Sequence, residues 1–201
     1  MNLRLLGLPA VALALVAGVL GIQLAHGGGS FEPTRTADPC AARQVDSVSA
    51  GIDGLTERLV LLGIDGAACR LHLSREALTL ELAEPEPPTD AELAALRQGL
   101  LDAVRRMKAD GTLPPASALV REALDAIELN GLLKAAILAL PDAVVDAALK
   151  TDDVLTRTID DLDLRDLLTN LEDPDDLARQ IEPVLTRAVQ DSLTERLRSL
   201  L

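Results

Sequence analysis

Residues 89–111 read TDAELAALRQGLLDAVRRMKADG and carry the clearest helical pattern in the chain. Thr89 and Glu92 have the spacing of a capping box, in which each side chain accepts the backbone N–H of the other residue. Apolar side chains recur at three- and four-residue steps along one stripe: Leu93, Leu96, Leu100, Val104 and Met107. Gly111 is a typical helix terminator. We therefore predict an amphipathic helix over 90–110.

The composition extends this prediction to the whole fold. The 201 residues include one Phe, no Tyr and no Trp. A core must then be built from aliphatic side chains, which pack readily between helices, and alternating β-branched runs typical of strands are scarce. We predict an all-α chain, with an N-terminal transmembrane helix followed by an extracytoplasmic domain of short amphipathic helices.

The transmembrane prediction rests on residues 5–25, LLGLPAVALALVAGVLGIQLA. A helix of about 20 residues spans the roughly 30 Å hydrocarbon core of a bilayer. A cleavable signal peptide needs an apolar run of only 7–15 residues and an A-x-A-like site. This run is longer and no A-x-A follows, so an anchor is favoured. Gly27 and Gly29 can imitate a cleavage site, and cleavage stays open as the alternative.

The flanking charges predict the orientation. The α-amino group and Arg4 lie on the short N-terminal side, and positive charge stays cytoplasmic. We therefore expect a single-pass protein of the cell membrane with its C-terminal part extracytoplasmic, or a secreted protein if residues 1–25 are removed. Partners are then the membrane, through residues 5–25, and a protein of the cell envelope.

Two cysteines, Cys40 and Cys69, follow this segment. In an exported domain such a pair usually forms a disulfide, and a loop of about 30 residues is worth about 3–4 kcal/mol in the chain-entropy model. We predict that they are bridged. The alternative is two unrelated buried thiols.

The remaining chain divides by composition. We predict a flexible Gly/Pro/Ser/Thr linker over 26–39, a disulfide-pinned helical hairpin region over 40–83, a Pro-rich linker over 84–88 and a helical domain over 89–201. Within the hairpin region, Gly-Ile-Asp-Gly occurs twice. Its aspartates, Asp53 and Asp65, can each cap a separate short helix, as Ser74 can cap a third.

The segment from Gly66 to Ala83, GAACRLHLSREALTLELA, resembles a helix-turn-helix. The second helix carries Arg75 against Glu76, Glu81 and Glu84, which makes a repulsive surface for DNA. The interpretation favoured by charge is a compact hairpin. The two Asp-Gly steps lack the alternating ligands and terminal Glu of a calcium loop.

The C-terminal half predicts further helices. Residues 116–129 are amphipathic, and 132–140, nearly all apolar, are predicted to be the buried central helix. Asp173 and Pro174 open a last helix that runs to residue 201 and is predicted to dock on 132–140. The acidic stretch 152–176 is interpreted as solvent-facing N-caps rather than a cation site.

No residue pattern carries specific chemistry. His26 and His72 are the only histidines, and no third ligand completes a metal set. We assign no catalytic, cofactor-binding or metal-binding residue and expect no cofactor. A net charge of −13 argues against nucleic acid. The predicted function is a binding or scaffolding module whose ligand stays open. The alternatives are a regulator that uses the hairpin and an enzyme with an unrecognised carboxylate site.

A resemblance supports the topology. An N-terminal anchor, an early Cys, the run GIDGAACRLHLSREALTLELA and a long helix ending in Ala-Asp-Gly together resemble uncharacterised single-pass exported helical proteins of GC-rich Gram-positive bacteria. The likeness covers roughly residues 1–120. It implies an anchored, exported bacterial protein and no particular activity.

Overall fold

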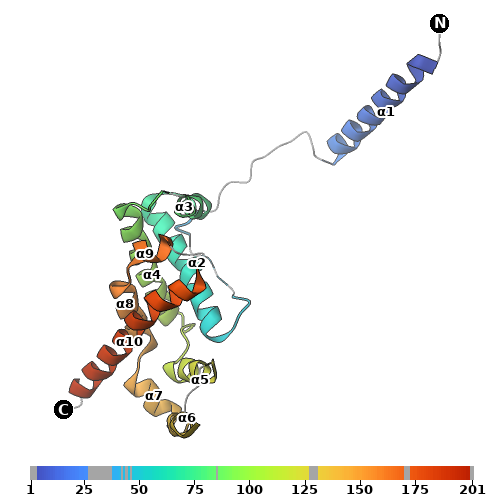
Figure 1. Cartoon of the computed structure of the whole chain (residues 1–201). Coiled ribbons are helices and arrows are strands. Elements are labelled where there is room, and N and C mark those ends of the chain that lie inside the picture. Colours follow the sequence, from blue (N-terminus) through green and yellow to red (C-terminus); the bar gives the residue numbers. More distant parts are fainter. Residues whose placement is uncertain are drawn as a thin grey trace. The chain divides into compact units, whose positions relative to one another are not determined.

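The computed structural model describes residues 4–26, 38–41, 43, 45, 47–84, 86–126, 131–169 and 173–199. All regular structure in these ranges is α-helical, which confirms the predicted all-α class (Figure 1). The chain divides into two compact units, Met1–Thr36 and Ala37–Leu201.

The first unit contains α1, Arg4–Ala25. In the part whose side chains are described, from Leu15 onward, the large apolar residues are more than half exposed, among them Leu15, Val19 and Leu24. Judged on the described residues, no helix combines the length and the apolar content that crossing a membrane requires. The predicted anchor therefore stays a prediction. Residues 27–37 of the predicted linker lie outside the described residues.

The second unit is built around two long helices, α2 (Gly51–Leu71) and α4 (Asp90–Ala109), which pack on each other more extensively than any other pair. They cross at glycines. A Cβ added to Gly99 would clash with the carbonyl oxygen of Gly63 and would lie 2.7 Å from the backbone nitrogen of Ala67. A Cβ on Gly66 would lie 3.0 Å from the Cα of Gly99. The helices approach backbone to backbone because no side chain separates them.

The two short helices predicted for residues 53–71 are wrong. Residues 51–71 form one uninterrupted helix, and neither Asp53 nor Asp65 caps it. Asp53 lies in the first turn, and the second Gly-Ile-Asp-Gly lies mid-helix. Its glycines serve the crossing with α4 rather than a turn, and burial of that crossing outweighs the weak helix propensity of glycine.

The helix predicted over 90–110 is confirmed. Thr89 Oγ1 accepts from Glu92 N at 3.3 Å, and Glu92 Oε2 accepts from Thr89 N at 2.6 Å, which completes the capping box. Leu96, Val104 and Met107 of the predicted stripe are buried. Leu93 and Leu100 pack against the same core at its edge.

Shorter helices surround this pair. They are α3 (Arg75–Leu82), α5 (Ala116–Ala126), α6 (Gly131–Leu138), α7 (Asp142–Ala148), α8 (Thr151–Asp161), α9 (Leu164–Thr169) and α10 (Pro174–Ser199). Figure 1 shows α3 at one end of the unit and α5, α6 and α7 at the other. Because α2 and α4 contribute to the same buried clusters, the Pro-rich segment 84–88 connects helices within one compact unit.

The predicted buried central helix over 132–140 is wrong. In α6, Ala135 and Ala136 are exposed, and the following Leu140 is 45% exposed. An eight-residue helix provides too little surface to organise a core, and the 20-residue α4 takes that position.

The last helix also has a different partner from the predicted one. α10 packs on α8 and, to a smaller extent, on α7 rather than on 132–140. Ala188 and Ser192 of α10 are fully buried, and their small side chains allow close approach. The prediction that the last helix packs within the chain is confirmed, but the helix on which it packs is α8.

Candidate functional site

A non-helical segment precedes α2, and its described residues contact α2 at several points. We call residues 38–50 the strap; those described are 38–41, 43, 45 and 47–50. Cys40 is bonded to Cys69, Arg43 pairs with Asp65, and the hydroxyl of Ser47 donates to Glu57. The residue numbers of the partners in α2 decrease as those of the strap residues increase. The strap therefore runs antiparallel to the helix.

The predicted disulfide is present. Cys40 and Cys69 are bonded, with their Cα atoms 4.9 Å apart, and no free cysteine remains. Cys69 lies in the last turns of α2, whereas Cys40 is an exposed residue. Asp38 Oδ1 accepts from the backbone N–H of Cys40 at 2.9 Å and fixes the approach of the strap. The bond therefore secures the outer end of the strap to α2.

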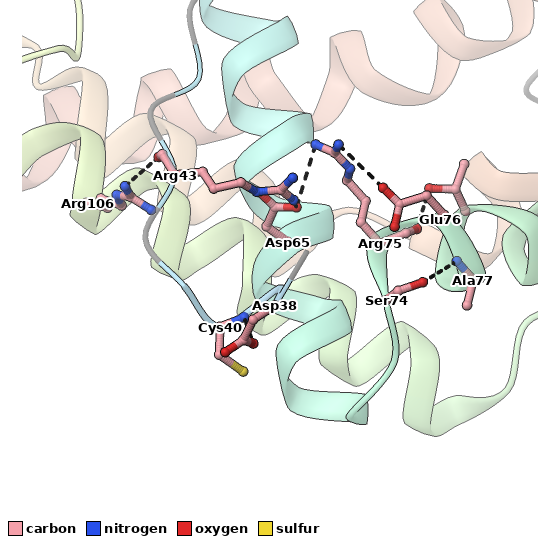
Figure 2. A network of polar contacts seen from close by, with 10 residues as sticks. Asp38, Cys40, Arg43, Asp65, Ser74, Arg75, Glu76, Ala77 and Arg106 are labelled. Atoms are coloured by element: carbon pink, nitrogen blue, oxygen red, sulfur yellow. Dashed lines mark hydrogen bonds and ion pairs between the residues drawn. The ribbon is translucent and has the colours of Figure 1, made fainter. Parts of the chain in front are cut away.

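Asp65 is the polar centre of this region (Figure 2). It is only 7% exposed, and its carboxylate pairs with the guanidinium of Arg43 from the strap. Arg75 of α3 lies 3.8 Å from the same oxygen and 3.6 Å from Glu76. A buried carboxylate left unpaired is strongly destabilising. One side chain of α2 thus links the strap and α3.

The long helix α4 holds the strap from the other side. Arg106 Nη2 donates to the carbonyl oxygen of Arg43 at 2.7 Å. One turn earlier, Asp102 pairs with both Arg70 and Arg105. Burial alone would raise the pKa of Asp102, but hydrogen bonds and charge from the two arginines outweigh it, and the net pKa is lowered. Asp102 is therefore held ionised.

A hollow of about 530 Å³ opens beside the disulfide. Its lining includes Pro39, Cys40, Cys69, Arg70, Asp102 and Arg106. The charges in it are already neutralised within the chain, because Arg70 pairs with Asp102 and Arg106 with Asp110 and the strap backbone. The hollow therefore gives access to the disulfide rather than offering an unpaired charge to an ion.

The segment that resembles a helix-turn-helix forms two helices, α2 and α3, joined by a short turn. His72 adopts the left-handed conformation, with φ of 58°, and ends α2. Its N–H bonds Cys69 O at 3.3 Å, and Leu73 N bonds Ala68 O at 3.0 Å, the pattern of a Schellman motif with His in place of Gly. Ser74 Oγ accepts from Ala77 N at 3.1 Å, which confirms the predicted cap of α3.

The surface charges of this hairpin are those that the sequence indicates. Arg75 is directed to Asp65 and Glu76, while Glu76 and Glu81 are exposed. A carboxylate-bearing second helix is unsuited to a phosphate backbone.

Three basic side chains near the end of α4 form ion pairs within the chain. Arg105 pairs with Asp102, Arg106 with Asp110, and Lys108 with Asp152 of α8. These contacts account for the cluster without a bound anion.

The acidic stretch 152–176 contains helix caps, as predicted. Asp163 Oδ1 accepts from the backbone N–H groups at the start of α9, and Asp173 does the same for α10, at 3.0–3.2 Å. In the ranges that the structure describes, no group of three or more His, Cys, Asp or Glu side chains could hold a metal ion.

Two long-range caps have no signal in the sequence. Ile52 N donates to both carboxylate oxygens of Glu122 at 3.0 Å, so a residue of α5 caps α2. The guanidinium of Arg97 donates to backbone carbonyls at the end of α8, among them Asp160 O and Leu162 O, each at 2.7 Å. Partners some 60–70 residues away cannot be found by local spacing.

No family model matches the chain, and no curated protein or solved structure matches it.

Proposed function

We propose that this chain is a helical binding or scaffolding module held at the outer face of a cell membrane by α1. The apolar side chains of α1 that are described are exposed rather than packed into a core. Residues 5–25 have the length of a bilayer span, and Arg4 precedes them. Insertion into lipid would remove this apolar surface from water.

The observation that carries the extracytoplasmic assignment is the Cys40–Cys69 bond. Disulfides persist in oxidising compartments and are rare where glutathione and thioredoxin keep thiols reduced. The bond joins the beginning of the unit Ala37–Leu201 to one of its two central helices. It thus holds the first residues of this unit against α2.

A binding role is favoured over catalysis by the state of the carboxylates. Asp65, Asp102, Asp152 and Asp153 each pair with Arg or Lys. Thr89 lowers the pKa of Glu92 by hydrogen bonding. Burial raises the pKa of Asp153, but contacts with Ser192 and Arg157 lower it by more. A general acid working near neutral pH needs a raised pKa. These carboxylates are suited to structural pairing.

The net charge of −13 suits a soluble, self-repelling domain outside the cell and a protein partner at the envelope rather than nucleic acid. A reporter that becomes active only after export, fused after Leu201, tests the topology. We expect activity with the full chain and none with a matched chain lacking residues 1–26. A reporter active only in the cytoplasm would contradict the proposal.

A second candidate is a cytoplasmic regulator that uses the α2–α3 hairpin. It is favoured by the well-formed turn with its His72 and Ser74 caps. Measured binding of the full chain to duplex DNA, falling steeply with salt, would support it. The exposed Glu76 and Glu81 make us expect no such binding. A third candidate, an enzyme, would require a turnover assay to succeed and has no assigned residue.

A further inference from the structure

We propose that Cys40–Cys69 is a redox-releasable latch, and that its reduction frees the strap from α2 while the helical core stays folded. The inference concerns how the unit changes state, which goes beyond the proposed function and does not depend on the membrane topology.

The described residues of the strap have few other attachments. Arg43 contributes one ion pair to Asp65 and one carbonyl to Arg106. Val45 is its one apolar side chain packed against a core cluster in the described part of the strap. Val48 is 99% exposed, and Ser47 is bonded near the chain reversal into α2. Among the contacts of the described strap residues, the covalent bond is therefore the main restraint on the outer end.

The core beneath does not depend on the strap. The two central helices meet at Gly63, Gly66 and Gly99, and the contact between them is made by their own residues. The buried members of the cluster next to the strap are Leu55, Leu62, Ala103 and Met107, all from α2 and α4. Removing the strap uncovers one edge of this cluster but leaves the helix–helix contact in place.

The bond is placed for attack. Cys40 is exposed, and both cysteines line the open hollow together with Arg70 and Arg106. A thiolate of an external dithiol attacks Cys40 Sγ, forms a mixed disulfide and displaces the Cys69 thiolate, which takes up a proton. The second thiol of the dithiol then displaces Cys40. The dithiol loses two electrons and becomes a disulfide, and both protein cysteines become thiols.

Release changes the polar centre. Once the strap is free, Arg43 is no longer held against Asp65. The carboxylate of Asp65 then keeps its pairing with Arg75, whose guanidinium lies 3.8 Å away. The strap, the end of α2 and the start of α3 are therefore coupled through one carboxylate. Reduction exposes part of the apolar face near Leu62 and Met107 and loosens one side of the hairpin.

Limited trypsin digestion of the full chain in detergent tests the latch. The bond after Arg43 is protected while its side chain, 28% exposed, is held against Asp65. With dithiothreitol we expect cleavage there to accelerate at least about tenfold, because cleavage follows the population of the open strap. Cleavage after Arg97 in α4 should not change, and oxidised glutathione should restore protection.

The double variant C40S/C69S is the matched control. It should be cut rapidly after Arg43 without reductant and should not respond to it. Two results would overturn the proposal. Unchanged cleavage after Arg43 on reduction would mean that non-covalent contacts hold the strap. Parallel acceleration after Arg97, with loss of the helical circular dichroism of the wild-type chain, would mean that the bond staples the whole fold. The reductant titration needs no variant, so a poorly folding C40S/C69S leaves the test intact.

Discussion

At the residue scale, two copies of one tetrapeptide show how environment decides a role. Asp53 and Asp65 occupy the same place in Gly-Ile-Asp-Gly, yet Asp53 is exposed and Asp65 is buried against Arg43. Asp65→Asn should lower the free energy of unfolding by about 1–3 kcal/mol, since Arg43 is only partly desolvated. Asp53→Asn should change it by less than about 1 kcal/mol. Denaturant unfolding checks both, and equal effects would contradict the assigned role of Asp65.

A second prediction concerns Gly99, whose lack of a Cβ allows α2 and α4 to come into backbone contact. Gly99→Ala gains helix propensity but forces the side chain toward Gly63 and Ala67. We expect a net loss of about 1–3 kcal/mol by overpacking. Gly131→Ala is the control, since nothing lies within 4 Å of the added Cβ. Thermal melting of the two variants side by side gives the comparison. A stabilised Gly99→Ala chain would mean that the helices do not cross there.

The cap from Glu122 can be tested in the same way. Glu122→Gln keeps an acceptor for Ile52 N but removes the negative charge from the N-terminus of α2. The unfolding free energy should fall by about 0.5–1 kcal/mol. Glu86→Gln, in an exposed connection, should be neutral. If both substitutions leave chemical denaturation curves unchanged, Glu122 does not cap α2 in solution.

At the element scale, helices with local start signals could be predicted and those fixed by packing could not. Thr89, Ser74 and Asp173 each begin a helix where the sequence indicates, because a cap needs only neighbours three residues away. The continuity of α2 through Gly63 depends on its close contact with Gly99 of α4. The exposure of α6 depends on which other helices fill the core. Of the candidate site, the disulfide could be predicted, whereas the Asp65 network required the strap's path.

The capping box of α4 gives a pH prediction. The pKa of Glu92 is lowered in the folded chain by its hydrogen bonds with Thr89. A lowered folded-state pKa adds stability above the unfolded pKa, and this stability is lost as pH falls through the folded value. The stability difference between the wild type and Glu92→Gln should therefore be present at pH 7 and shrink below about pH 5. Unfolding curves at several pH values measure it. A difference that grew toward acid pH would show the opposite sign of coupling.

At the scale of the whole molecule, one helical unit is joined to an apolar helix by a short connection and closed by a disulfide. The chain carries a net charge of −13, and Arg43, Arg70 and Arg105 are paired with carboxylates within the unit. An all-α unit of this kind could be predicted from composition. The packing of α2 on α4 across the Pro-rich segment 84–88 could not, because that segment has the composition of a domain boundary.

The most direct test is differential alkylation of Cys40 and Cys69 in living cells. Free thiols are blocked before lysis, the membrane fraction is collected, and the protein is reduced and labelled with a second reagent. We predict that the full-length chain is recovered with membranes and that both cysteines carry only the second label. Recovery in the soluble cytoplasmic fraction with both cysteines carrying the first label would contradict the account.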